Sequence, residues 1–385
     1  GVIECAGWST VYDTYCVPFT SCPPIKLEFG AYRWDEEEIV ILTDLYDKWL
    51  SDGHRTSEIK FQGLDLIGDM SDVLRPLVVY GLSLCRHIDR AVTCMLDNIS
   101  PDAVCSQGII NMADRRLARA CMERSIPLLS MQHGGSIGTH VNAGAELNDW
   151  AYSDYYLTYG EGIKTYPNPI IPQRASLVAV GSASLEYGLT TRSSPDRGSE
   201  ETIRVLWVSE KSFGNTIGHQ NLVEDTRRYL LQKKCLSILA GCAGMRVTFR
   251  PEQYTTNMLG TVRWVESDPF VNIYLDADTE FHELLDHNDI VIADLYASSV
   301  WNEAIAFEKP LILYCDPLQT PLMSQFQHDL ELSCHLCKTE EELVDAVQKL
   351  VEEGKDFIED LRQADTTVFL EKYVLHRNDG RCAER

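Results

Sequence analysis

The sequence predicts an α/β protein with two domains, each a parallel sheet covered by helices. Short apolar segments of strand length alternate with helical segments along most of the chain, and this alternation is typical of parallel sheets. The length of 385 residues also suits two domains. Between two such series lies TTRSSPDRGSE at 190–200, a polar segment without periodicity that we predict to be a linker.

The first series predicts an N-terminal domain at 1–190. Residues 1–36 show no clear pattern, whereas 39–42 is a short apolar run that predicts a strand. Apolar residues recur at helical spacing in two longer segments, so helices are predicted at 74–99 and 111–124. Further short buried strands are predicted at 103–105, 126–131, 155–159 and 177–180.

The second series predicts a C-terminal domain at 201–355. Its apolar runs of strand length lie at 203–208, 246–249, 271–274, 290–293 and 310–314. Segments of helical spacing follow these strands and lie at 221–239, 280–285, 298–307, 340–353 and 355–361. The repetition is therefore architectural, because the two domains share the strand–helix order without a repeated sequence.

The charge of the chain bears on its partners. The net charge is −24, from 34 basic and 58 acidic residues. Such a surface repels phosphate backbones, so nucleic acid is not expected as a partner. It also opposes an anionic ligand at long range, which means that such a ligand needs local donors and helix N-termini to bind.

Other features bear on location. No run of about 18 apolar residues predicts a membrane span, and no basic start followed by an apolar stretch predicts a signal peptide. The 13 cysteines, an odd number, favour free thiols in a reducing cytoplasm. The first residue is Gly rather than Met, so we expect the natural chain to be longer.

Two patterns that resemble metal motifs are interpreted as structural. Cys334 and Cys337 have CxxC spacing, but no second pair completes the four ligands that a zinc site needs. Asp276 and Asp278 form a DxD pattern just before a predicted helix, where we interpret them as capping residues. We therefore expect no metal site.

The candidate site residues follow predicted strands, because open parallel sheets bind ligands outside the carboxyl ends of their strands. The strongest cluster is Gln132, His133, Gly134 and Gly135. Its glycines let backbone N–H groups approach an anion. The His133 imidazole is suited to proton transfer or to donation to a phosphate. The alternative is a tight turn that the histidine caps.

A second cluster follows the predicted strand at 290–293. Asp294 ends the strand, and Ser298 and Ser299 open the next helix, where hydroxyls and N–H groups suit a phosphate. Glu303 lies one turn after Ser299 on the same helix face, where a carboxylate can accept hydrogen bonds from a ribose diol. The alternative is an ordinary helix N-cap beside a solvated glutamate.

Four further residues complete the candidate ligand-binding set. Arg250 and Glu252 follow the strand at 246–249, where a guanidinium can pair with phosphate. Lys211 lies in the loop after the strand at 203–208, and Glu161 follows the strand at 155–159. The sequence lacks GxGxxG, GxxxxGK[ST] and GxSxG, which argues against dinucleotide oxidoreductases, P-loop NTPases and serine hydrolases.

In this order, the segments resemble GT-B glycosyltransferases of bacterial surface polysaccharide synthesis, in particular the capsule and O-antigen Kdo transferases and their CMP-sugar-using relatives. The resemblance covers about 102–317 and rests on QHGG, YGEG, VGSAS, RPEQ and DLYASSVWNEAIAFEKPLILY. The chain departs from many CMP-sugar enzymes in one respect, since Arg250-Pro251 stands where they carry His-Pro.

The resemblance implies a GT-B fold, with two Rossmann-like domains facing a central cleft and residues 356–385 crossing back onto the first domain. It implies a metal-independent glycosyltransferase without a resident cofactor. The sugar, favoured as Kdo or another nonulosonate from a CMP donor, goes to an oligosaccharide or glycolipid acceptor. His133 is the expected catalytic residue, and Asp114 is the nearest acidic candidate for a nucleophile, with pairing to Arg115 as its alternative.

The same resemblance implies a cytoplasmic enzyme, compatible with peripheral association at the inner face of the membrane and with further domains of a longer polypeptide. Two alternatives stay open. One is another GT-B enzyme, such as a polyol-phosphate transferase or a UDP-sugar epimerase. The other is a non-catalytic GT-B-like scaffold domain.

Overall fold

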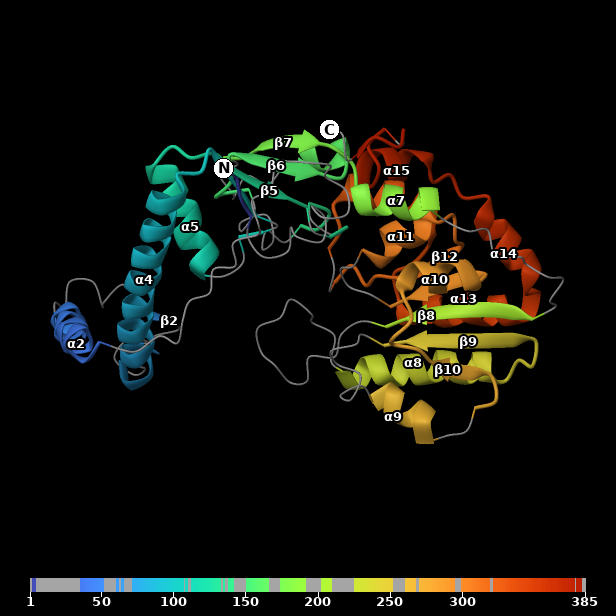
Figure 1. Ribbon diagram of the computed structural model, residues 1–385. Coiled ribbons are helices and arrows are strands. Elements are labelled where there is room, and N and C mark those ends of the chain that lie inside the picture. The colour runs from blue at the N-terminus through green and yellow to red at the C-terminus, as the bar shows by residue number, and fades with distance from the viewer. Residues whose placement is uncertain are drawn as a thin grey trace.

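The computed structural model shows two parallel sheets with helices packed on them (Figure 1). The residues that it describes are 2–4, 35–51, 60–61, 64–65, 71–106, 108–109, 112–132, 134–135, 138–141, 150–165, 174–191, 202–209, 225–251, 260–267, 270–294, 299–318, 321–377 and 379–382. The predicted α/β class with parallel sheets is therefore confirmed.

The first sheet has the order β1-β4-β5-β6-β7, and every neighbouring pair is parallel. Its strands run in chain order across the sheet, with Val104 opposite Leu128 and Leu129 opposite Tyr155. Their bounds are Val2–Glu4 for β1, Ala103–Ser106 for β4, Leu128–Met131 for β5, Tyr155–Thr158 for β6 and Ser176–Ala179 for β7. The carboxyl ends of β5, β6 and β7 consequently lie at one edge.

The second sheet has the order β10-β9-β8-β11-β12-β13 and is also parallel throughout. The order reverses between β8 and β11, which is the switch point where open α/β sheets bind ligands. The bounds are Ile203–Val208 for β8, Met245–Arg250 for β9, Ile273–Leu275 for β10, Ile290–Ala293 for β11, Leu311–Tyr314 for β12 and His335–Cys337 for β13.

Helices of the first half include one correction to the sequence-based prediction. Residues 39–42 are part of α2 (Glu36–Ser51), not of a strand. Asp35 accepts hydrogen bonds from the N–H groups of Glu37 and Glu38, and the buried residues Glu38, Leu42 and Tyr46 recur every four positions, which is a helical period.

The other helices of the first half are α4 (Ser71–Ile99), α5 (Met112–Glu123), the 3-10 helix η2 (Glu161–Thr165) and α7 (Ala183–Thr191). A small antiparallel pair is formed by β2 (Lys60–Phe61) and β3 (Leu64–Asp65).

Helices of the second half cover both faces of its sheet. They are α8 (Asp225–Ala240), α9 (Gly260–Ser267), α10 (Phe281–His287), α11 (Val300–Ala306), α12 (Ser324–Ser333), α13 (Glu340–Glu353), α14 (Lys355–Arg362) and α15 (Thr367–Tyr373). The predicted helices in this half are all present, whereas α9, α12 and α15 were not predicted.

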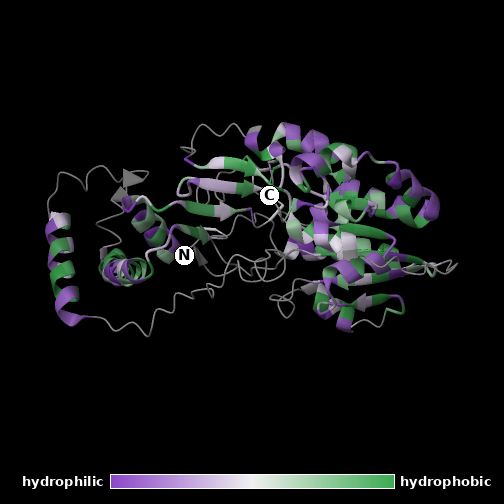
Figure 2. Ribbon diagram, turned by 45° about the horizontal axis from the view of Figure 1, so that its top comes forward, coloured by the Kyte–Doolittle hydropathy of each residue, from purple (hydrophilic) through white to green (hydrophobic). Residues whose placement is uncertain are grey.

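Alternate residues of the second sheet feed two separate cores. Val205, Trp207 and Phe249 point into a core shared with α8, α9, α13 and α14. Leu206 and Val291 point into the opposite core, which α7, α10, α11, α12 and α15 complete. Both faces of the sheet pack on apolar cores, and Figure 2 shows hydrophobic residues along these strands, interrupted by polar ones.

The end of the chain lies against both halves. Helix α15 contributes Phe369 and Tyr373 to a core of the second sheet and also contacts η2 of the first half. The N–H of Ser182 donates to the carbonyl of Val374 over 2.9 Å. A Cβ on Gly160 would lie 2.0 Å from the carbonyl oxygen of Lys372, so only glycine permits this approach. Residues 192–201, which contain most of the predicted linker, lie outside the described residues.

No helix among the described residues is long and apolar enough to cross a membrane.

Candidate functional site

A cavity of about 400 Å³ is lined by residues from both halves of the chain, and we call it the cleft. Its walls follow the carboxyl ends of β5, β6 and β7 on one side and the first turns of α10 and α11 on the other. The lining residues are Met131, Gln132, Tyr159, Ser182, Ala183, Ser184, Leu185, Glu280, Phe281, His282, Ser299, Asn302 and Glu303. This is the position at which parallel α/β domains bind ligands.

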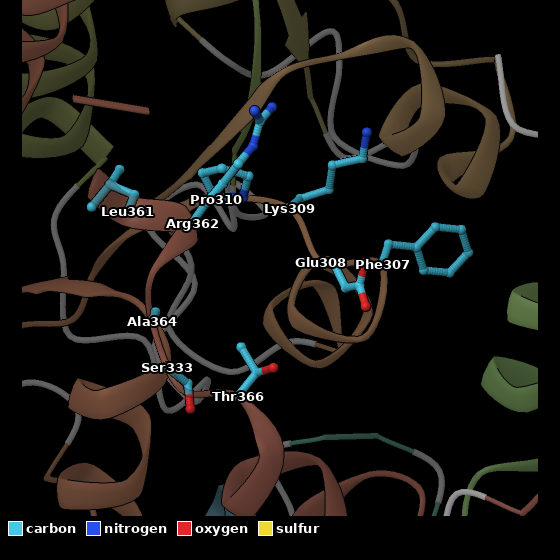
Figure 3. A pocket seen from close by; sticks show the side chains of 9 residues that line it. All are labelled: Phe307, Glu308, Lys309, Pro310, Ser333, Leu361, Arg362, Ala364 and Thr366. Carbon is cyan, nitrogen blue, oxygen red and sulfur yellow. The ribbon is translucent and has the colours of Figure 1, made fainter. Parts of the chain in front are cut away.

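A second cavity of about 370 Å³ lies elsewhere in the second half (Figure 3). It is lined by Phe307, Glu308, Lys309, Pro310, Ser333, Leu361, Arg362, Ala364 and Thr366. Pro310 precedes β12 and Ser333 precedes β13, so this cavity lies at the amino ends of those strands. In Figure 3 the side chains of Phe307 and Lys309 point away from the others, and the Lys309 ammonium donates to the Asn288 carbonyl over 2.9 Å. Position therefore favours the cleft as the functional site.

Gln132 links two strand ends on the first wall of the cleft. Its side-chain Nε2 donates to the Gly134 carbonyl over 2.8 Å, and its Oε1 accepts from the N–H of Tyr159 over 2.9 Å. The residue is almost fully buried. Gln132 thus fixes the turn that begins the QHGG sequence against the end of β6.

Gly135 touches the second half of the chain directly. A Cβ at this position would lie 2.3 Å from the Nδ2 atom of Asn302, which is closer than any real contact. Gly134 differs, because a Cβ there would meet nothing within 4 Å. The requirement for glycine in this turn is therefore specific to position 135 and arises from the contact between the two halves.

Asn302 is fully buried in α11, and both polar atoms of its side chain lack a hydrogen-bond partner among the residues described. A buried amide left unpaired costs about 1–3 kcal/mol. The carboxamide offers two N–H donors and one carbonyl acceptor, so a group that both donates and accepts would satisfy it. Such an unpaired side chain in the wall of a cleft is typical of a ligand-binding position.

His282 and Glu303 form a pair across the cleft wall. His282 Nε2 lies 3.0 Å from Glu303 Oε2, and the imidazole packs against Phe307 with ring centroids 4.8 Å apart. The hydrogen bond and the negative charge of Glu303 raise the pKa of His282, although burial opposes the shift. The pair consequently favours an imidazolium ion, which is a hydrogen-bond donor and a positive charge in the cleft.

Tyr159 supplies a neutral hydroxyl on the opposite wall. Burial raises the pKa of Tyr159 to about 12, against the lowering effect of its hydrogen bond with Ser182, and the Glu303 charge adds to the increase. The phenol therefore stays protonated at neutral pH. The cleft thus combines a neutral phenol, an imidazole, a carboxylate and an unpaired amide.

A search for related proteins identifies the family. The model of the LIC12162 family transferase matches residues 86–332, which is more than half of the chain. The chain belongs to the LIC12162 transferase family. No curated protein matches the sequence significantly.

Solved structures with the same fold include UDP-GlcNAc 2-epimerase from Neisseria meningitidis bound to UDP-GlcNAc, with a TM-score of 0.54, 13% identity, and coverage of 79% of this chain and 80% of that one. MnaA of S. aureus with UDP has a TM-score of 0.54, 12% identity, and coverage of 78% and 76%. The 2-epimerase of Rickettsia bellii has a TM-score of 0.50, 15% identity, and coverage of 78% and 76%. At this identity the likeness shows the fold, and it confirms the predicted GT-B architecture.

The structure brings Gln132, Ser299 and Glu303 to the cleft, as the strand-end argument predicts. Ser299 is the N-cap residue of α11, and its side chain makes no capping hydrogen bond. The roles of these residues in donor binding stay predictions. His133, Lys211, Glu252 and Ser298 lie outside the described residues.

Arg250 and Asp294 lie outside the cleft lining. The Arg250 guanidinium donates to the Thr279 carbonyl and lies over the Phe281 ring, 5.6 Å from its centroid. Asp294 is buried after β11 and accepts a 2.5 Å hydrogen bond from Gln232 Nε2. Both residues are therefore engaged with the protein in this structure.

Two other predicted residues lie away from the cleft lining. Asp114 is in the first turn of α5, which packs on α4. Glu161 is exposed in η2 and forms an ion pair with Lys164 at 2.8 Å. The cleft residues that the sequence argument missed include Tyr159, which follows β6, and His282 and Asn302, which lie on α10 and α11.

The DxD pattern and the CxxC pattern have structural roles. Asp276 Oδ1 accepts from the N–H groups of Asp278 and Thr279, so it caps the turn before α10, whose own N-cap residue is Glu280. Cys337 is buried, and burial raises the pKa of its thiol to about 12. Within the described ranges, no group of three or more His, Cys, Asp or Glu residues is arranged to hold a metal.

Proposed function

We propose that this transferase binds a pyrimidine-nucleotide sugar in the cleft and transfers its glycosyl group to a glycan acceptor. The observation that carries the proposal is the cleft itself, in which an imidazole–carboxylate pair and an unpaired amide meet between two parallel sheets. The transferase family and the GT-B fold support the same reaction class.

The choice of nucleotide rests on two sources. The sequence resemblance favours a CMP-sugar, with Kdo or another nonulosonate as the transferred sugar. The titles of two similar structures name UDP or UDP-GlcNAc as bound molecules. Both nucleotides share a pyrimidine, a ribose diol and a phosphate, and the proposal commits to that shared chemistry.

Glu303 and His282 each have a task in this reaction. Glu303 Oε2 holds His282, which leaves Oε1 to accept hydrogen bonds from the ribose diol. The bond between the anomeric carbon and the donor phosphate breaks, and the electron pair leaves with the phosphate. The acceptor hydroxyl forms the new bond to the anomeric carbon and passes its proton to solvent. The His282 imidazolium donates a hydrogen bond to the leaving phosphate and offsets its charge.

Asn302 is assigned to the sugar rather than to the phosphate. A phosphate only accepts hydrogen bonds, so it would satisfy the amide nitrogen and leave the carbonyl oxygen unpaired. A sugar hydroxyl both donates and accepts and would satisfy both atoms. The reaction in this proposal uses no resident metal or cofactor, and activity that survives exhaustive chelation would support this point.

Nucleotide binding tests the proposal first. We expect CMP or UDP, but not GDP, to raise the melting temperature and to bind with a measurable heat in calorimetry. Donor consumption should then require an acceptor glycan. If no nucleotide binds, the chain is a scaffold and the proposal fails. If UDP-GlcNAc is epimerised without an acceptor, the chain is an epimerase like its structural neighbours and the transfer reaction is wrong.

A pair of adjacent glycines gives a matched test of the cleft. Gly135→Ala should weaken donor binding or turnover about tenfold or more, because the new methyl group collides with Asn302 and separates the walls. Gly134→Ala should behave like the unchanged protein, because it meets nothing within 4 Å. Circular dichroism would show that both variants fold. Equal activity of the two variants would contradict a catalytic role for this contact.

A further inference from the structure

Four polar side chains are buried together at the switch point of the second sheet, and we call them the switch-point cluster. Ser209 directly follows β8 and Asp294 directly follows β11, and these two strands are parallel neighbours. Gln232 comes from α8 and Thr261 comes from α9. None of the four residues is more than 6% exposed.

The pleat of the two strands explains why these side chains meet. Successive side chains of a strand point to opposite faces of the sheet. Val205 and Trp207 of β8 and Ile292 of β11 point into the core shared with α8 and α9. Ser209 and Asp294 each come two residues later, so they lie on that same face. Helices α10 and α11, which form one wall of the cleft, pack on the other face (Figure 1).

Gln232 joins the two strand ends through its carboxamide. Its Nε2 donates to Ser209 Oγ over 2.7 Å and to Asp294 Oδ2 over 2.5 Å, so both of its N–H donors are used. Its Oε1 accepts a hydrogen bond from the Thr261 hydroxyl. The Thr261 bond thereby holds the carboxamide in the orientation that turns both N–H groups toward the strands.

Backbone hydrogen bonds extend this connection to a third strand. The N–H of Ser209 donates to the Arg250 carbonyl at the end of β9 over 3.0 Å. The N–H of Asp294 donates to the Val208 carbonyl over 3.3 Å. The carboxyl ends of three adjacent strands are therefore fixed relative to one another, at the edge where parallel sheets bind ligands.

A polar cluster is not needed to fill this part of the core. Apolar groups of the same shape can replace a buried, fully paired set of polar groups at little cost in stability. What the polar set adds is geometry, because a satisfied hydrogen-bond network specifies one arrangement of its members. The place where the geometry is specified is the switch point, which indicates a role in ligand binding.

The segments that continue from the two strand ends lead to predicted ligand-binding residues. Lys211 follows Ser209 by two positions, and Ser299 follows Asp294 by five. Ser299 lines the cleft and is the N-cap residue of α11, which also carries Glu303. The positions from which both segments start are thus set by the switch-point cluster.

We propose that Gln232 is a positioning residue for nucleotide binding, which acts through Ser209 and Asp294. This inference rests on the proposed function, in which the cleft binds a nucleotide sugar. Gln232 is fully buried and outside the cleft lining, so it holds the strand ends without touching the ligand. Its loss weakens nucleotide binding more than it slows the chemical step, because His282 lies on α10, which precedes β11 and does not continue from either strand end.

Two substitutions of Thr261 form a matched test. Thr261→Val keeps a similar volume but removes the hydroxyl that orients Gln232, whereas Thr261→Ser keeps the hydroxyl. We expect Thr261→Val to raise the Kd of CMP or UDP and the KM of the donor about three- to tenfold, with kcat within about twofold of the wild type. Thr261→Ser should restore most of the affinity. Titration calorimetry and initial rates, both well below the melting temperature of each variant, measure these effects.

A second variant removes the whole connection. Gln232→Met keeps the length of the side chain and a good helix former but loses all three hydrogen bonds. It should raise the Kd of the nucleotide further, about tenfold or more. The Thr261 pair decides the question even where Gln232→Met does not fold.

Ser333→Ala is the control, because it also removes a buried hydroxyl, one that donates to the Asp329 carbonyl away from the cluster. Its Kd should equal that of the wild type. If the wild type binds neither CMP nor UDP, the proposed function fails and this inference falls with it. If the wild type binds and Thr261→Val binds equally well, this inference alone is wrong. It is also overturned if Ser333→Ala weakens binding as much as Thr261→Val, or if Thr261→Val lowers kcat and leaves KM unchanged.

Discussion

His282 and Glu303 show how a site arises from residues that are distant in sequence. His282 lies in the first turn of α10 and Glu303 lies in α11, and packing of both helices on the same side of the second sheet brings their side chains to 3.0 Å. Glu303 raises the pKa of His282, and Glu280 and Asp286 on α10 act in the same direction. The charge state of the cleft is therefore set by two helices together.

This pair predicts a pH dependence of stability. The folded-state pKa of His282 lies above its unfolded value of about 6.5, so the stabilisation is fully present below about pH 6.5 and is lost as the pH rises through the folded-state value. Glu303→Gln should therefore lower the melting temperature most near about pH 6 and least near about pH 9. Scanning fluorimetry across this range measures the difference.

Glu283→Gln serves as the control for that prediction, because Glu283 is exposed on the same helix. The difference in melting temperature between Glu283→Gln and the wild type should not change with pH as His282 loses its proton. If the loss of melting temperature caused by Glu303→Gln grew with rising pH, the pairing of His282 with Glu303 would be contradicted.

Some of the site could be predicted from the sequence because polar residues after buried strands mark the ligand edge of a parallel sheet. This argument finds Gln132, Ser299 and Glu303, which line the cleft. It cannot find Asn302, whose importance arises from burial against Gly135 of the other half. Nor can it find His282, because its partner is fixed by how two helices pack.

Most strands of the second half were predictable because they are buried on both faces. Such strands are uninterrupted apolar runs, as in β11 and β12, where every residue is buried. The strand predicted at 39–42 was wrong, since these residues belong to α2. Four apolar residues fit a strand or one helical turn, and only the Asp35 cap and the buried residues at spacing four identify α2.

Helix α15 could not be assigned from the sequence because its stability comes from tertiary contacts. Asp329 of α12 accepts hydrogen bonds from Lys372 Nζ at 2.8 Å and Tyr373 Oη at 2.9 Å. Burial would raise the pKa of Asp329, but these bonds and one from Gln325 outweigh it, and the pKa is lowered. One carboxylate thus fastens the C-terminal helix beside the first half.

Asp329→Ala should lower the free energy of unfolding by about 1–3 kcal/mol at neutral pH, because it leaves the buried hydroxyl of Tyr373 unpaired. A lowered carboxyl pKa contributes stability above the unfolded value of about 3.9 and loses it as the pH falls through the folded value. The penalty should therefore shrink below about pH 4. Urea denaturation at several pH values measures it.

The exposed Glu352 of α13 provides the comparison for Asp329. Glu352→Ala should change the urea midpoint little at any pH. If Asp329→Ala were equally mild at neutral pH, the carboxylate would not be what fastens α15.

At the scale of the whole molecule, the two halves meet at a second place besides Gly135. The N–H of Val141 donates to the Pro321 carbonyl, and the N–H of Met323 donates to the Thr139 carbonyl, both over 2.8 Å. His140 and Leu322 form the antiparallel bridge between them. These contacts, together with α15, hold the two halves in the arrangement of Figure 1.

The net charge of −24 acts on the whole molecule and gives a prediction for donor capture. An anionic nucleotide sugar approaches a negative protein whose cleft lining includes Glu280 and Glu303 beside His282. Raising the ionic strength from about 20 mM to about 150 mM shortens the Debye length from about 20 Å to about 8 Å and screens this repulsion. We therefore expect kcat/KM for the donor to rise about two- to fivefold. Basic clefts that attract anions show the opposite trend.

Initial rates at fixed pH measure the effect of ionic strength on kcat/KM. Potassium acetate and sodium chloride should act alike if screening is the cause. A kcat/KM that fell with added salt would mean that local positive charge at the cleft, rather than the charge of the molecule, governs the approach of the donor.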